Sequence, residues 1–172
     1  MITRERLKGA YSEGEALAIY KEVKDNGKFL DFLKSYMYDE DYQVARNTLW
    51  GLTKATNAEL SQLQPMLHEL IDNAMKVENS SVRRLTLNII ERLKMEEDDL
   101  RTDFLDFCLE HMQSLEEFPG IQSLCLKLAY RMCTFYPELM DELKRTLEAM
   151  EISYYSPAVT SVRRRILADK FK

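Results

Sequence analysis

The chain has 172 residues, of which 45% are hydrophobic and 31% are charged. This hydrophobic content can build a folded core, so the composition excludes a disordered tail. The formal net charge of −5 argues against a general nucleic-acid binder, although a negative total can conceal a basic face.

The residue usage favours an all-helical protein. Only five Gly and four Pro are present, and residues that lose little side-chain freedom in a helix, such as Leu, Glu, Lys, Arg and Met, are abundant. The N-terminal MITRERLKGA has no apolar stretch of signal-peptide length, and no apolar run approaches the ~18 residues of a transmembrane helix. The three cysteines form no CxxC pair, and an odd number fits reduced thiols better than a secreted disulfide framework. We therefore expect a cytoplasmic protein.

The helices are predicted from caps and breaks along the chain. Ser12 and Glu15 form a capping-box pattern at the start of the first helix, and Gly27 ends it because glycine accepts the left-handed conformation. Asn57 is expected to cap a later helix, and Pro65 is expected to begin or kink that helix. Further helices are predicted in pairs over residues 29–38 and 42–56, 57–77 and 80–94, 98–115 and 121–135, and 137–150 and 157–170.

The second helices of these pairs repeat one another. One apolar column, Leu49, Leu87 and Leu126, is interrupted in the last helix, where Arg164 stands at the corresponding position. Shifting the alignment of the last helix by three residues would instead match residues 162–164 with 82–84. A period near 40 residues with two helices in each unit is typical of an α-solenoid, in which each pair buries its face against its neighbours. Two apolar columns keep spacings of 38, 39 and 38 residues: Val44, Val82, Ile121 and Val159, and Leu52, Ile90, Ala129 and Leu167.

At this point the chain resembles the HEAT-repeat family of armadillo-type α-solenoids. The likeness is carried by Asp41…Val44-Ala45-Arg46, Asn79…Val82-Arg83-Arg84 and Val159…Val162-Arg163, and by Pro65 in a first helix. The third repeat departs from the pattern, because Gln122 and Ser123 stand where the second repeat has arginines.

The resemblance implies an all-α, right-handed α-α superhelix. It covers about residues 28 to 172 and gives a single domain with repeats at about 28–57, 58–95, 96–136 and 137–172, and residues 1–27 as an N-terminal cap that contains one helix. Such arrays serve many unrelated roles, so the resemblance specifies the fold better than the function.

The charges separate between first and second helices. The second helices with their flanks, residues 42–56, 80–94, 119–135 and 157–172, hold 13 Lys and Arg against 2 Asp and Glu. The first helices with theirs, residues 28–38, 58–78, 96–117 and 137–151, hold 19 acidic against 6 basic residues. The resemblance implies that the second helices line the concave side, so we expect a basic inner surface and an acidic outer one.

Basic side chains interleaved with aromatic ones suit a groove for an acidic peptide or another polyanion. A purely structural role is an open alternative, since HEAT-like units often pair a turn Asp with a second-helix Arg. Here the pair would be Asp41 with Arg46, or a neighbouring turn carboxylate with Arg84. Nucleic acid is a second alternative partner. The predicted partner-binding residues are Arg46, Trp50, Lys54, Arg84, Asn88, Arg92, Lys127, Tyr130, Arg131 and Arg165.

Candidate catalytic and metal sites are weak. Cys108 and His111 share a helix face near Cys125 and Cys133, but their apolar neighbours favour cysteines packed in the core over a zinc site. The acidic residues near position 100 lack the spacing of a calcium loop. There is no glycine-rich phosphate loop, GxSxG or HExxH. We therefore expect no metal, no cofactor and no catalysis.

One enzyme class is an alternative. HEAT-like DNA alkylation-repair glycosylases use a basic concave face with aromatic and acidic residues, and Arg46, Trp50, Arg84 and Tyr130 are similar in kind. The second helices offer only Glu91 and Asp169 as acids, which departs from that chemistry. The sequence thus predicts a non-catalytic interaction scaffold that binds an acidic protein or peptide on a basic concave face.

Overall fold

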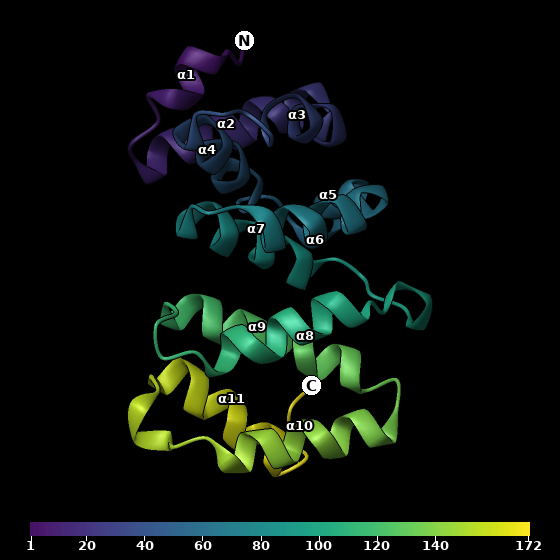
Figure 1. The fold of residues 1–172 in the computed structure, drawn as a ribbon. Coiled ribbons are helices and arrows are strands. Elements are labelled where there is room, and N and C mark those ends of the chain that lie inside the picture. Colours follow the sequence, from purple (N-terminus) through teal and green to yellow (C-terminus); the bar gives the residue numbers. More distant parts are fainter. The chain divides into compact units, whose positions relative to one another are not determined.

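The structure, a computed structural model, describes residues 1–172 and contains α-helices and short 3-10 helices with no strand (Figure 1). The predicted all-helical class and the four helix pairs are confirmed. The handedness of a superhelix, the repeat boundaries and the single domain stay predictions. The α-helices are α1 (Arg4–Lys8), α2 (Glu13–Asn26), α3 (Phe29–Tyr36), α4 (Tyr42–Leu52), α5 (Asn57–Leu60), α6 (Leu67–Lys76), α7 (Ser80–Arg92), α8 (Thr102–Gln113), α9 (Pro119–Cys133), α10 (Pro137–Ala149) and α11 (Pro157–Leu167), and the 3-10 helices are η1 (Ser61–Met66), η2 (Glu97–Asp99) and η3 (Ile152–Tyr154).

The helix ends follow from local chemistry. Ser12 and Glu15 form the predicted capping box of α2, and Gly27 ends that helix with a φ of 66°, in the left-handed region. The prediction that Asn57 caps α5 is wrong. The cap is Thr56, whose hydroxyl accepts the Glu59 N–H at 3.1 Å while the Glu59 carboxylate accepts the Thr56 N–H at 2.9 Å.

Several helix limits differ from the prediction. Pro65 lies in η1 and the α-helix resumes at Leu67, because proline has no N–H to donate to the preceding turn. The last helix ends at Leu167, three residues early, where Asp169 adopts a φ of 55°. The five-residue α1 was not predicted, so residues 1–27 contain two helices instead of one.

The chain divides into two compact units, Met1–Lys94 and Met95–Lys172. In the first unit α4 is central and packs against α1, α2, α3 and α7. Its buried residues Val44, Leu49 and Leu52 are the apolar columns identified from the repeat. Buried Asn47 donates its amide N–H to the Leu7 carbonyl at 2.6 Å, which fastens α1 to α4.

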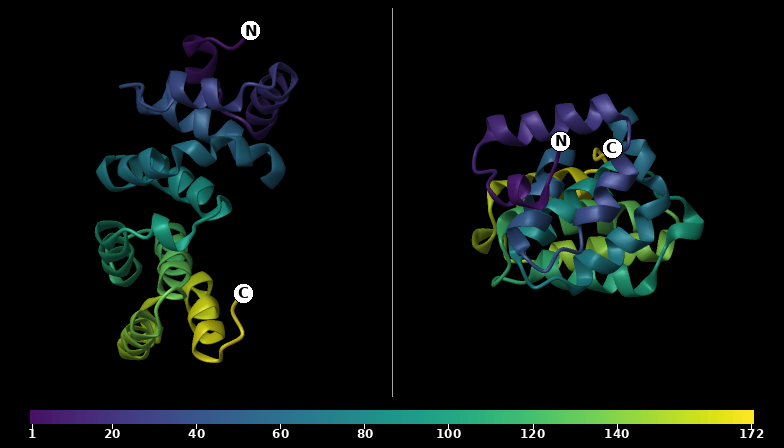
Figure 2. Two further views of the ribbon diagram at one scale, coloured as in Figure 1. Left: turned by 90° about the vertical axis from the view of Figure 1, so that its right-hand side faces the viewer. Right: turned by 90° about the horizontal axis from the view of Figure 1, so that it is seen from above.

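In the second unit α9 packs against α8, α10 and α11. Figure 2 (left) shows α8 and α10 in one layer and α9 and α11 in the other. Cys108, Cys125 and Cys133 are all buried free thiols, which confirms their predicted place in the core. Burial raises the pKa of the Cys108 thiol, and it raises that of Cys133 to about 11, so neither is a thiolate nucleophile at neutral pH.

Acid is expected to loosen α1. Arg4 donates to both carboxylate oxygens of Asp39 at 2.8 and 3.0 Å, and Lys8 lies 3.0 Å from the Asp41 carboxylate. The hydrogen bond from Arg4 is the main cause that holds the pKa of Asp39 below its ordinary 3.8, and Lys8 similarly lowers the pKa of Asp41. A lowered pKa gives stability that is present above the ordinary pKa and is lost as the pH falls through the folded-state pKa.

The measurement is urea unfolding of the wild type and of Asp39→Asn between pH 8 and pH 2. We expect the wild type to be the more stable near neutral pH, with a difference that shrinks below a pH of about 4. Arg4→Ala should show the same convergence. A difference that stays constant down to pH 2 would contradict a contribution from this ion pair.

Candidate functional site

A hollow in the first unit is formed between α4, α7 and the segment that joins α1 to α2. Its volume is about 370 Å³. We call it the Trp50 hollow. Arg46 and Trp50 are four residues apart and therefore share one face of α4, and α7, which packs against α4, supplies the opposite wall. The lining residues are Tyr11, Arg46, Trp50, Ser81, Arg84 and Leu85.

The charge of the Trp50 hollow is positive, and no carboxylate lines it. Arg84 is exposed and has no acidic partner. The Arg46 side chain donates from Nε to the Asn47 amide oxygen at 3.2 Å, and its guanidinium lies 5.8 Å from the centre of the Tyr42 ring. Two arginines, Arg46 and Arg84, therefore line the hollow together with the half-buried Trp50.

The structural pairing of Arg46 with Asp41, which the sequence left open, is not formed. Asp41 instead accepts the Gln43 N–H at 2.9 Å and lies 3.0 Å from the Lys8 ammonium. The arginine that holds the α6–α7 turn together is Arg83, which donates to the carbonyls of Ala74 and Val77 at 2.8 and 2.6 Å. Arg83 thus stabilises the turn, and Arg84 remains exposed on the surface.

Three further predicted residues of the first unit lie outside the hollow. Lys54 forms an ion pair with Glu13, and Asn88 is half-buried. Arg92 donates to the Thr53 carbonyl at 2.9 Å, to the Ala55 carbonyl, and to the side-chain oxygen of Asn57 at 2.9 Å. Burial lowers the pKa of Arg92, and its guanidinium fastens α7 to the segment after α4.

The predicted residues of the second unit lie on α9 and α11, where Lys127, Tyr130 and Arg131 are half-buried and Arg165 is exposed. Tyr130 donates its hydroxyl to the Phe171 carbonyl at 3.2 Å, and the two rings meet edge to face with centres 5.0 Å apart. The Arg165 guanidinium lies 5.1 Å from the centre of the Phe171 ring. The segment after α11 therefore covers part of this face, which the sequence did not predict because the helix was expected to reach 170.

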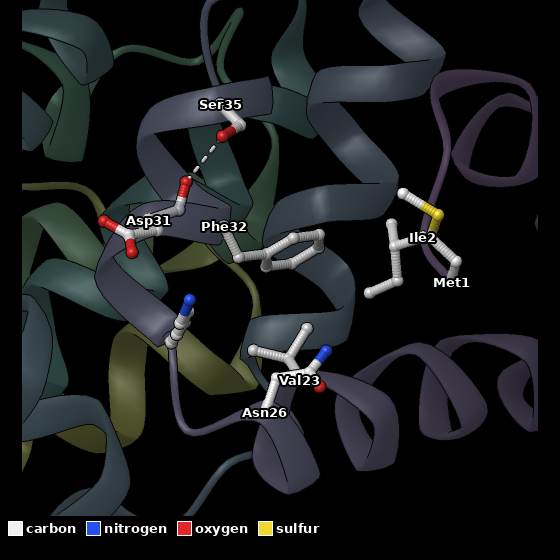
Figure 3. A pocket seen from close by; sticks show the side chains of 8 residues that line it. Met1, Ile2, Val23, Asn26, Asp31, Phe32 and Ser35 are labelled. Atoms are coloured by element: carbon white, nitrogen blue, oxygen red, sulfur yellow. Dashed lines mark hydrogen bonds between the residues drawn. The ribbon is translucent and has the colours of Figure 1, made fainter.

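A second hollow of the first unit, of about 400 Å³, was also missed from the sequence because no motif marks it. Figure 3 shows its apolar side chains facing one another, among them Ile2, Val23 and Phe32, with Ser35 donating to the Asp31 carbonyl at 2.7 Å. Its charged side chains, Lys28 and Asp31, have opposite signs, and the N-terminal ammonium of Met1, which also lines it, is paired with Glu22. This hollow therefore has no excess charge and no group of polar side chains that converge on a ligand.

His111 and Asp169, two of the side chains considered for chemistry, each lie beside a partner of opposite character. His111, which shares a helix face with Cys108, has its Nδ1 2.7 Å from the Glu117 carboxylate, and its ring stacks on Phe107 with centres 3.9 Å apart. Asp169 is held by the Lys144 ammonium at 2.6 Å. No group of three or more His, Cys, Asp or Glu side chains is arranged to hold a metal ion.

A family model described as HEAT repeat domain matches residues 3–170. Searches of curated proteins and of solved structures found no match. None of the helices has the length and apolar character needed to cross a membrane. The family match extends over nearly the whole chain and agrees with the paired helices and the repeated apolar columns, so this chain belongs to the HEAT repeat domain family, whose arrays generally mediate protein interactions.

Proposed function

We propose that this protein is a non-catalytic interaction scaffold that binds an acidic protein or peptide along the faces of its second helices. The observation that carries the proposal is the meeting of Arg46 and Arg84 in the Trp50 hollow with no carboxylate among the lining residues. Opposite charge on a partner would compensate these arginines and would steer the partner to this surface.

The distribution of charge over the chain supports the same partner. The second helices carry most of the Lys and Arg, and the first helices carry most of the acids, while the chain as a whole has a net charge of −5. Within each unit, an acidic partner would be attracted to the second helices and repelled by the first. In the second unit Lys127, Arg131 and Arg165 are the residues proposed to contact an acidic partner.

Reversing the charge of the hollow should greatly weaken this binding. We expect the double variant Arg46→Glu with Arg84→Glu to bind a fluorescein-labelled acidic peptide about 100-fold more weakly than the wild type at low salt, because like charges placed opposite each other cost several kcal/mol. Fluorescence anisotropy gives the affinity, and circular dichroism checks that the helices persist. Added salt should weaken binding of the wild type, since the arginines are solvent-accessible.

The matched control is Lys34→Glu with Lys76→Glu, which makes the same change in net charge on exposed positions of the first helices α3 and α6. It should bind like the wild type. Equal weakening by both double variants would mean that only the total charge matters and would contradict the proposed site. A single-stranded oligodeoxynucleotide that binds more tightly than the acidic peptide would replace the proposed partner with nucleic acid.

A further inference from the structure

The walls of the Trp50 hollow include aromatic and aliphatic side chains beside its two arginines. Trp50 is half-buried, Leu85 is buried, and Tyr11 is 71% exposed beside them. Tyr11 offers its ring to solvent at the edge of a hollow that already contains an indole and two guanidinium groups. A ligand that only supplied negative charge would leave these aromatic and aliphatic surfaces in contact with water.

In the second unit, a similar set of aromatic and basic side chains on α9 and α11 binds a phenylalanine of the same chain. The ring of Phe171 meets Tyr130 edge to face and lies under the Arg165 guanidinium, with centres 5.0 and 5.1 Å away. Two residues earlier, the Asp169 carboxylate lies 2.6 Å from the Lys144 ammonium. An aromatic side chain and a nearby carboxylate are thus held together by one aromatic ring and two cations.

The Trp50 hollow offers the same kinds of groups without an occupant from its own chain. Trp50 and Tyr11 supply the rings, and Arg46 and Arg84 supply the cations. Its volume of about 370 Å³ lies at the small end of the range of ligand pockets, about 300 to 1,000 Å³, which suits one side chain better than a large cofactor. Edge-to-face contacts with an incoming ring and cation–π contacts from the arginines both favour an aromatic group.

The segment around Phe171 is a poor candidate for this hollow in a second copy of the chain. Lys170 and Lys172 flank its phenylalanine, and they would face Arg46 and Arg84. Phe171 is also engaged by Tyr130 within its own unit. An occupant with acidic flanks would match the charge, as the proposed function requires.

We infer that the Trp50 hollow binds an aromatic side chain of an acidic partner segment, with neighbouring carboxylates paired to Arg46 and Arg84. This inference rests on the proposed function, because it assumes an acidic partner. It adds that the aromatic residue is the anchor and that the acidic residues orient it. Buried aromatic anchors that are surrounded by polar contacts contribute most of the energy in many interfaces.

The test uses the full chain and three capped nine-residue peptides. The first has a central phenylalanine with four acidic residues on each side, the second replaces the phenylalanine with alanine, and the third replaces the acids with Gln and Asn. We expect the first to bind at least about tenfold more tightly than each of the others. The chain contains one tryptophan, Trp50, so intrinsic fluorescence reports on the hollow itself and should change with the phenylalanine peptide.

The variant Tyr11→Ser locates the aromatic contact. Tyr11 is exposed, so its removal should leave the fold intact, weaken the phenylalanine peptide about fivefold and leave the alanine peptide unaffected. The matched control is Tyr154→Ser, which removes a tyrosine that is 69% exposed in the other unit and should change neither affinity.

The outcomes separate the two proposals. If the phenylalanine and alanine peptides bind equally and both are lost in Arg46→Glu with Arg84→Glu, the inference is overturned and the proposed function stands. If the phenylalanine peptide is preferred but Tyr11→Ser and Trp50 fluorescence do not respond, the aromatic group binds elsewhere and the inference is likewise overturned. If no acidic peptide binds, the inference and the proposed function are both overturned.

Discussion

Replacing Arg92 with alanine is expected to lower the free energy of unfolding by about 3 kcal/mol. The guanidinium donates to the carbonyls of Thr53 and Ala55 and to Asn57, and Ala55 is buried. Hydrogen bonds from a charged donor contribute about 1.5 to 3 kcal/mol each, and their contributions are not additive. The expected loss of about 3 kcal/mol therefore refers to the loss of all the hydrogen bonds of Arg92 together. Arg92→Lys should not restore the stability, because one ammonium cannot reproduce the planar fork that spans three acceptors. Urea unfolding followed by circular dichroism measures the change.

The matched control is Arg84→Ala, the same substitution eight residues earlier on the same helix. Arg84 is exposed and has no acidic partner, so the unfolding free energy should stay within about 0.5 kcal/mol of the wild type. Binding of an acidic peptide should show the opposite order, with Arg84→Ala the weaker binder. If Arg92→Ala were as stable as Arg84→Ala, the structural role assigned to Arg92 would be refuted, and it would return to the set of partner-binding residues.

The features of the fold that could be predicted are those that depend on residues close together in the sequence. The capping box of Ser12 and Glu15 and the left-handed Gly27 each involve a few neighbouring residues, so their chemistry is visible in a short stretch. Two of the apolar columns were equally clear, because their spacing recurs in all four pairs, whereas the third is interrupted by Arg164. Helix α1 could not be found in this way. Its five residues are held by Asp39, Asp41 and Asn47, which lie more than thirty residues away in the sequence.

The residues of the candidate site likewise fall into those that the repeat pattern predicted and those that depend on contacts between distant segments. Arg46 and Arg84 were predicted together because they occupy corresponding positions on second helices, and Trp50 because it shares a helix face with Arg46; the structure places these three residues around one hollow. Tyr11 was missed, since it lies between α1 and α2 and reaches the hollow only through their packing. The sequence also could not assign each cation its partner. Lys54 pairs with Glu13 and Arg92 with backbone carbonyls, and both choices depend on contacts between distant segments.

Phe104→Ala should be among the most destabilising substitutions in the second unit, with a loss of about 3 to 5 kcal/mol in unfolding free energy. Phe104 is 0% exposed and is one of the largest fully buried side chains. Its removal takes apolar surface out of the core and leaves a cavity that the surrounding helices fill only in part, and both effects add to the cost. Phe118→Ala is the matched control. Phe118 is 59% exposed just before α9, so the same chemical change should cost less than about 0.5 kcal/mol.

The same pair of variants tests the predicted single domain. Trp50 is the only tryptophan and belongs to the first unit, whereas Phe104 belongs to the second. In a solenoid that unfolds as one cooperative array, neighbouring repeats stabilise one another through their interfaces. Phe104→Ala should therefore lower the urea midpoint reported by Trp50 fluorescence and the midpoint reported by circular dichroism by the same amount. A fluorescence midpoint that stays at its wild-type value while the circular dichroism transition splits would refute the single domain and show two units that unfold independently. Equal stability of Phe104→Ala and Phe118→Ala would instead contradict the packing of the second unit, because a fully buried ring and an exposed one cannot cost the same to remove.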